Sequence, residues 1–151
     1  MRKLYVVTAA CAAVCAALFA AGCAPGREPS VSVRLLRSDR EAVVVEVAEG
    51  DEGKSLYDAL VLLREDGALT FGGSESEFGF YVTSVNGVEA SESAYWAVYT
   101  SLGTLDGVVY SDPSYGTWAY EGRELSSASY GVSGLPLADG ALFALVYTSL
   151  E

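Results

Sequence analysis

No side chain of this 151-residue chain stands in a recognisable catalytic motif. There is no histidine, and all three cysteines lie within the first 23 residues. No calcium loop of the Asp-x-Asp-x-Asp-Gly type occurs, so no metal site is expected. Neighbouring carboxylates occur in predicted turns, where solvated charge is the ordinary explanation and a hydrolase using two of them is the alternative. These are Asp51/Glu52, Glu65/Asp66 and Glu75/Glu77. We therefore expect a protein that is not an enzyme.

Cys23 is the cysteine for which the sequence predicts a chemical role. Arg2 and Lys3 precede the uncharged, apolar stretch Leu4 to Ala21, which leads into Gly22-Cys23. A basic start, an apolar stretch and small residues before a cleavage point are typical of an export signal. Small-small-Cys also resembles the lipobox of bacterial lipoproteins, which implies acylation of the Cys23 thiol. We expect residues 1–22 to be a lipoprotein signal peptide and the mature chain to be extracytoplasmic and lipid-anchored to the cell membrane.

Two alternatives to the lipoprotein signal remain open. One is a plain secretory signal, and the other is a single transmembrane anchor, because the apolar stretch is about long enough to span a bilayer. Removing 22 of 151 residues leaves 129, enough for one domain. Seven basic and twenty acidic residues then remain, a net charge of −13. Because that charge repels phosphate backbones, nucleic acid is not an expected partner. With Cys23 acylated, no disulfide can form.

Aromatic residues are the strongest candidates for binding. In the run Tyr95-Trp96-Ala97-Val98-Tyr99, strand alternation places Trp96 and Val98 on one face and both tyrosines on the other. Tyr and Trp combine a broad apolar body with a polar tip, which suits a planar or sugar-like ligand. The expected ligand-binding residues are Tyr95, Tyr99, Tyr115, Trp118 and Tyr120. The alternative is that a second small sheet packs on that face. Trp96 is expected in the core, and Trp118 is equally compatible with packing and ligand contact.

One helix is predicted, over Ser55 to Asp66. Ser55 can cap it, and Asp58 stands three residues on, as in a capping box. Its apolar residues recur at helical spacing on a single face, which indicates core packing rather than a cofactor site. They are Leu56, Ala59, Leu60 and Leu63.

Strand patterns surround this helix. A short strand is expected to begin near Val31, and Asn86-Gly87 predicts a tight hairpin turn. Residues 68–77 are expected to form a loop, and residues 101–134 an irregular region with short strands at 108–110 and 117–120. The other expected strands are 40–49, 78–85, 94–100 and 141–149, the last apolar on both faces. The fold class is α+β: one main helix packed on a mostly antiparallel sheet (β-grasp-like), with a second small sheet or β-rich loop region. Residues 23–38 are expected to be a tether and 39–151 the domain.

The order of several short motifs resembles a known family. They are Ser55-Leu56-Tyr57-Asp58-Ala59-Leu60, the stretch GFYVTSVNGV (79–88), the aromatic run 95–99, and ADGALFALVY (138–147). Together they resemble the C-terminal domain of transcobalamin and intrinsic factor, which recurs in bacterial surface lipoproteins as a family of unknown function. The resemblance covers about residues 41–148. Thr100-Ser101-Leu102-Gly103 stands where Val-Asn-Gly often follows the aromatic strand in the family.

In the vitamin carriers, such a domain lies over one face of cobalamin while a separate helical barrel holds the other face. The resemblance therefore implies a binding module. We expect a surface-anchored, non-catalytic lipoprotein that binds a small molecule, with cobalamin or a related vitamin as the candidate ligand and no certain cofactor. An uptake system is its expected partner. The alternative is a protein-interaction or adhesion module on the cell surface.

Overall fold

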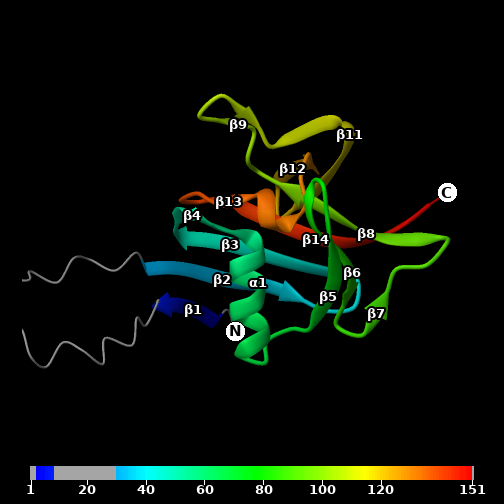
Figure 1. Cartoon of the computed structure of the whole chain (residues 1–151), viewed down its shortest axis with the longest axis horizontal. Coiled ribbons are helices and arrows are strands. Elements are labelled where there is room, and N and C mark those ends of the chain that lie inside the picture. The colour runs from blue at the N-terminus through cyan, green and yellow to red at the C-terminus, as the bar shows by residue number, and fades with distance from the viewer. Residues whose placement is uncertain (1–2, 9–29, 151) are drawn as a thin grey trace, which may run out of the picture.

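The computed structural model describes residues 3–8 and 30–150 (Figure 1). Cys23 and the rest of the expected tether before Ser30 lie outside the described residues, as does most of the predicted signal peptide. The elements are β1 (Lys3–Thr8), β2 (Ser30–Ser38), β3 (Ala42–Glu49), β4 (Asp51–Ser55), α1 (Leu56–Glu65), β5 (Phe71–Ser76), β6 (Gly79–Val85), β7 (Val88–Glu89), β8 (Ala94–Thr100), β9 (Thr104–Leu105), β10 (Val108–Val109), β11 (Ser111–Tyr120), β12 (Arg123–Ala128), the 3₁₀ helix η2 (Val132–Gly134), β13 (Pro136–Leu137) and β14 (Leu142–Ser149).

The main sheet is antiparallel, in the order β1-β2-β3-β14-β8-β12-β11. Six of these strands come from residues 30–149, and β1 adds a seventh at the edge of β2. The strand expected near Val31 is therefore β2, which makes residues 30–38 part of the sheet. Strand β14 lies at the centre between β3 and β8, and its residues 142–145 are all buried. This confirms the prediction from its two apolar faces.

Helix α1 covers one face of the main sheet. Its predicted apolar stripe is buried in a core shared with Val45 and Phe143 of the sheet. At its start, the Ser55 backbone N–H donates to the Asp58 carboxylate at 2.7 Å, which satisfies a donor at the helix terminus. The predicted helix and its core face are confirmed. No helix among the described residues is long and apolar enough to cross a membrane.

A small three-stranded sheet, β5-β6-β7, lies beside α1 on the same side of the main sheet. Asn86 and Gly87 turn β6 into β7 with φ angles of 50° and 81°, as the Asn-Gly motif predicts. The expected loop at 68–77 is wrong, because residues 71–76 form β5 and pair with β6. Glycine and serine at 72–74 give β5 little strand propensity of its own, so cross-strand pairing determines its conformation.

The other face of the main sheet is covered by the β11–β12 ribbon. Strand β12 pairs with β8 only through Ser126 and Ser127. Beyond these residues the ribbon crosses the sheet, and Leu125 is buried in a second core with residues of β3 and β14. The Tyr120 hydroxyl reaches the Leu36 carbonyl of β2 at 3.5 Å, and Arg123 pairs with Glu46 of β3 at 3.4 Å. A layer of protein thus lies on each face of the sheet.

The protein is mostly β, with one short α-helix among the described residues, an antiparallel main sheet and several small sheets. The predicted helix packed on an antiparallel sheet is confirmed at this level. Every residue of the described chain that is buried lies between Val31 and Leu145. From β1, the partly buried Tyr5 packs against the margin of this core.

Candidate functional site: a groove beneath the β5–β6 hairpin

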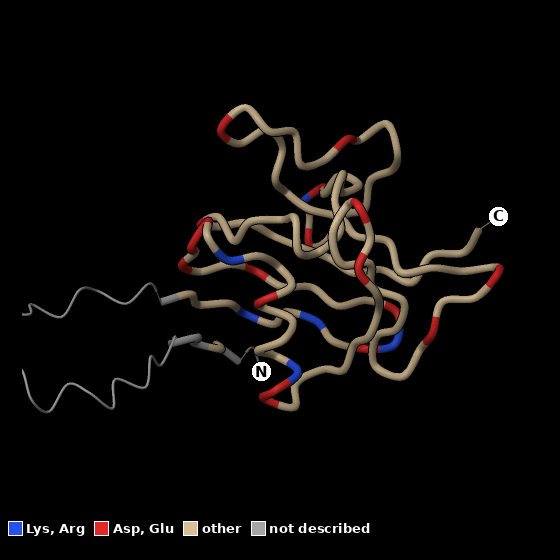
Figure 2. Tube along the Cα trace, viewed as in Figure 1, with Lys and Arg blue, Asp and Glu red and all other residues tan. Residues whose placement is uncertain are grey.

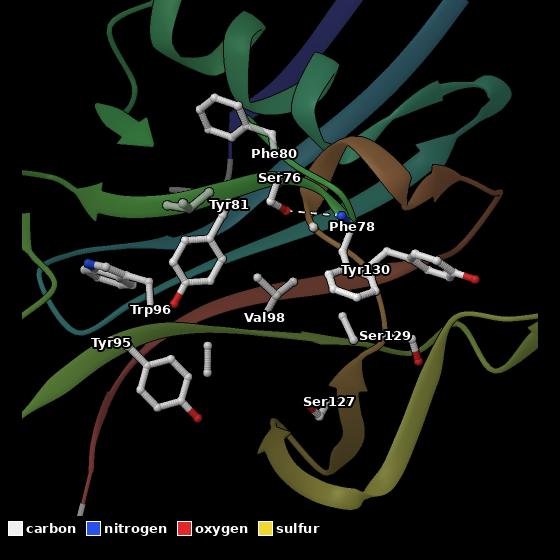
Figure 3. A pocket seen from close by; sticks show the side chains of 14 residues that line it. Ser76, Phe78, Phe80, Tyr81, Tyr95, Trp96, Val98, Ser127, Ser129 and Tyr130 are labelled. Carbon is white, nitrogen blue, oxygen red and sulfur yellow. Dashed lines mark hydrogen bonds between the residues drawn. The ribbon is translucent and has the colours of Figure 1, made fainter. Parts of the chain in front are cut away.

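A groove of about 270 Å³ opens between the β5–β6 hairpin and the main sheet. Ser76, Phe78 and Tyr81 line it from the hairpin, and Trp96 and Val98 line it from β8. The end of β12 and the segment that follows close it with Ser127, Ala128, Ser129, Tyr130 and Gly131. We call this site the hairpin groove; Figure 3 shows Tyr81 pointing from β6 towards Val98 of β8.

The tip of the hairpin is attached to η2 and to Gly131, the residue before it. The Gly131 N–H donates to the Phe78 carbonyl at 2.8 Å, and the Phe80 N–H donates to the Ser133 hydroxyl at 2.8 Å. Gly131 lies so close to the hairpin that an added Cβ would collide with the Phe80 carbonyl oxygen. The close approach therefore requires glycine at this position, and it sets one wall of the groove relative to the other.

The far end of the small sheet is attached to the main sheet by two side chains. The Trp96 indole N–H donates to the Val88 carbonyl at 2.9 Å, and the Tyr147 hydroxyl donates to the Glu89 carbonyl at 3.1 Å. Trp96 is 1% exposed and its ring lies 5.2 Å from that of Tyr147. The expectation that Trp96 belongs to the core is confirmed. It presents an apolar wall to the groove, because its single donor is already used.

Several aromatic side chains at the groove are unusually exposed for their size. Phe78 is 61% exposed, Tyr81 47% and Tyr130 37%. Phe80, by contrast, turns away from the groove and packs on Tyr57 of α1, with the ring centroids 4.8 Å apart. Exposed apolar residues that have no binding role are usually scattered singly over a protein surface. Exposed aromatic rings gathered around one groove are instead typical of a surface that binds a ligand or another protein.

The polar groups at the groove are hydroxyls without charge. None of its lining residues is Asp, Glu, Lys or Arg. Within residues 30–150, the hydroxyls of Tyr81, Ser127 and Ser129 have no hydrogen-bonded protein partner. Figure 2 shows acidic residues at the tips of several loops instead. The groove therefore offers apolar ring faces and free hydroxyl groups, which suit an uncharged ligand with a flat apolar part and a polar edge.

Three of the five predicted binding residues form a cluster on the opposite face of the main sheet. The rings of Tyr99 and Trp118 are stacked with centroids 6.4 Å apart, and those of Trp118 and Tyr120 with centroids 6.0 Å apart. We call these three residues the outer stack. All three are half-buried and pack against the second core, where they cover Leu125. The structure therefore places Trp118 in a packing position. The surroundings of Trp118 match the alternative to ligand contact, in which a second layer of strands packs on this face.

The other two predicted residues lie apart from the outer stack. Tyr95 is among the residues that line the hairpin groove. Its ring, however, lies on the opposite side of β8 from the side chain of Val98 (Figure 3). Tyr115 lies where the β11–β12 register shifts between Asp112 and Thr117, and it is 82% exposed. The five predicted residues thus do not form one groove. The alternation of β8 is nevertheless as predicted, since Trp96 and Val98 face the helix-side core and Tyr99 faces away from it.

Sequence reasoning missed Phe78, Tyr81 and Tyr130 as groove residues. Phe78 and Tyr81 belong to a stretch predicted as an ordinary strand, and Tyr130 to a stretch predicted as irregular. A usable signal was the adjacent pair Phe80-Tyr81, because neighbouring residues of a strand point to opposite faces and cannot both face one core. Which face they present depends on the pairing partner, β5, which was predicted as a loop.

The described residues offer no arrangement suited to acid–base catalysis by a carboxylate pair. Thr100 is the only polar residue among them that is buried, so none of the described carboxylates is buried. The pKa of Asp39 is lowered to about 2, chiefly by the hydrogen bond from Arg37, and the pKa of Asp112 is lowered by its hydrogen bonds from Ser114. Both acids lie outside the groove. The described residues also contain no group of three potential metal ligands.

Comparison with known proteins adds no family to this geometry. No protein-family model matches the chain, and no curated protein sequence matches it. The function must therefore be argued from the groove and from the sequence motifs.

Proposed function

We propose that this chain is a surface-anchored, non-catalytic binding lipoprotein whose hairpin groove holds part of a small, uncharged molecule. The observation that supports this proposal is the groove's lining of exposed aromatic rings and unpartnered hydroxyls, without any charged side chain. Acylation of Cys23 and removal of residues 1–22 would hold the domain at the outer surface of the membrane. The proposal includes the β-grasp-like arrangement and the likeness to the transcobalamin C-terminal domain, which rest on the motifs at 55–60, 79–88, 95–99 and 138–147.

The volume of the groove limits the ligand. Pockets that bury a drug-sized ligand measure about 300–1,000 Å³, whereas the hairpin groove measures about 270 Å³. It accommodates one ring system with its substituents. A corrinoid such as cobalamin would place only an edge there and leave most of its surface for a partner of the uptake system. Cobalamin or a related vitamin remains our candidate ligand on the strength of the family resemblance.

Thermal unfolding of residues 24–151 against corrinoids, other vitamins and glycans tests this proposal. A ligand specific for the folded state stabilises it by about 2.7 kcal/mol at one hundred times its Kd. We expect Tyr81→Ala to abolish that response, because its ring and hydroxyl face the groove. Tyr115→Ala is the matched control, since it removes an exposed tyrosine elsewhere and should leave the response intact. A flat response across the panel from a well-folded protein would contradict the proposal.

A protein-interaction or adhesion module is the second candidate. The exposed ring of Phe78 at the hairpin tip favours it, because a side chain that is 61% exposed is available to a flat protein surface. Phe78→Ser would then weaken attachment of the purified domain to a partner cell surface. Because Phe78 also lines the groove, this variant alone does not separate the two candidates. A well-folded domain that attaches to the partner cell surface but shows no thermal shift with any small molecule would favour the second candidate.

A further inference from the structure

We infer that the mature chain pairs with a second copy of itself along the free edge of β2. The inference rests on the predicted removal of residues 1–22, which is part of the proposed function. In the structure, β1 (Lys3–Thr8) pairs with β2 in a regular antiparallel register from Ser30 to Leu35. Cleavage before Cys23 removes β1. The backbone donors and acceptors that it satisfied then face solvent along an ordered edge strand.

The β2 edge is well formed for such pairing. On its inner side β2 pairs with β3, and both irregularities in register, at Ser32/Val33 and Leu35/Arg37, lie on that side. On its outer side the six pairs with β1 continue without a shift. Bulges that would discourage a new strand are thus absent from the side that cleavage exposes.

The occupant must bring an apolar side chain to Val33. Tyr5 lies opposite Val33 in β1 and packs against the helix-side core. Loss of Tyr5 leaves the apolar side chains of Val31, Val33 and Leu35 at the margin of that core. A second β2 strand supplies the replacement. With a two-fold axis through Val33, Val33 lies opposite Val33 of the second copy, and Val31 lies opposite Leu35 of the second copy.

This register also avoids a clash of charges. It places Ser32 opposite Arg34 of the second copy on the outward face, whereas an axis through Arg34 would place two arginines opposite each other. Each Arg34 keeps its 3.2 Å ion pair with Glu46 of its own chain.

The lipid anchor favours the same arrangement. Six residues lie between Cys23 and Ser30, so an extended tether of seven residue steps reaches at most about 25 Å. Both copies are therefore held near one membrane, which raises their effective concentration. A two-fold axis along the membrane normal lets both tethers reach that membrane.

Sedimentation equilibrium of residues 24–151 tests the pairing through its charges. In the symmetric dimer, residue 32 of each copy lies opposite Arg34 of the other copy, so one substitution changes two contacts. Ser32→Glu should lower the dissociation constant of the dimer roughly tenfold, whereas Ser32→Arg should raise it by a similar factor. Thr117→Glu and Thr117→Arg, on the exposed strand β11, are matched controls and should change nothing. The inference is overturned if the protein is a monomer at all concentrations. It is also overturned if the dissociation constant of the dimer is the same for Ser32→Glu and Ser32→Arg.

A disulfide trap tests the register. Residues 24–151 contain no cysteine, so any crosslink comes from the introduced thiol. Val33→Cys lies on the proposed two-fold axis and should form a disulfide-linked dimer under mild oxidation. Val31→Cys is buried on the same face of β2 but lies opposite Leu35, and it should not. Crosslinking through Val31→Cys in preference to Val33→Cys overturns the register. Ligand binding is scored separately by thermal shift, so a monomer that still binds its ligand contradicts this inference and leaves the proposed function standing.

Discussion

At the scale of single residues, Asp39 shows how one carboxylate can organise a turn. It accepts a 2.6 Å hydrogen bond from Arg37 and further ones from the backbone N–H groups of Glu41 and Ala42. Its own carbonyl accepts from the Asn86 side chain at 2.9 Å, which joins the β2–β3 turn to the β6–β7 turn. These donors favour the charged form, and the pKa of Asp39 is lowered from 3.8 to about 2.

The lowered pKa predicts how stability depends on pH. A carboxyl group with a lower pKa in the folded state stabilises the fold above its unfolded pKa, and this contribution is lost as pH falls from about 4 to about 2. Because the side chain is 46% exposed, solvent screening keeps the contribution below about 1 kcal/mol. We expect Asp39→Asn to lower the free energy of unfolding at pH 6 and to differ less from wild type at pH 2. Urea titrations at both pH values measure this.

The control for Asp39→Asn is Glu75→Gln, which removes an exposed carboxylate from strand β5 rather than from a turn. If Asp39→Asn destabilises the protein equally at pH 2 and pH 6, the carboxylate acts only through its shape and the electrostatic account is wrong.

At the scale of elements, attachment of the hairpin through Gly131 carries its own prediction. A Cβ at position 131 would collide with the Phe80 carbonyl oxygen, which belongs to the backbone of β6 and cannot move alone. We expect Gly131→Ala to lower the free energy of unfolding by about 1–3 kcal/mol, as overpacking does, and to weaken ligand binding because the hairpin must shift. Gly103→Ala is the matched control, since nothing lies within 4 Å of its added Cβ. Equal unfolding midpoints for the two variants would show that the close approach is unimportant.

Some helices and strands of this fold could be predicted from local sequence patterns, and others could not. Helix α1 was predictable because its stripe and its Ser55/Asp58 cap are both local signals, and β14 because its apolar run indicates a strand covered on both faces. Strands β5 and β12 were not. Residues 72–74 have low strand propensity, and β12 has a single buried apolar residue, Leu125, so hydrogen bonding to neighbouring strands determines both conformations.

At the scale of the whole molecule, the candidate site was harder to predict than the fold. The hairpin groove joins residues near 78–81, 96–98 and 127–131, which meet only after β8 and β12 pair and the hairpin folds over them. Alternation along β8 correctly assigned faces to Trp96 and Tyr99. It could not show that the β11–β12 ribbon would cover the Tyr99 face, because that depends on where the ribbon leaves β8.

The two tryptophans lie on opposite faces of the main sheet, which allows the packing role of the outer stack to be tested. Trp118 is half-buried between Tyr99 and Tyr120, so we expect Trp118→Ala to lower the free energy of unfolding by about 2 kcal/mol, less than the 3–5 kcal/mol typical of a fully buried aromatic residue. Denaturant unfolding measures this, and Tyr115→Ala should stay within about 0.5 kcal/mol of wild type.

The same variant also locates the ligand. Trp118→Ala leaves Trp96, in the wall of the hairpin groove, as the only tryptophan of the protein. If the groove is the binding site, a ligand that shifts the thermal midpoint will still change the fluorescence of this variant, because the remaining indole lies beside the bound molecule. A ligand response that disappears in Trp118→Ala, while the free energy of unfolding changes little, would instead place the binding surface on the outer stack. The two outcomes exclude each other, because the ligand response of Trp118→Ala either persists or disappears.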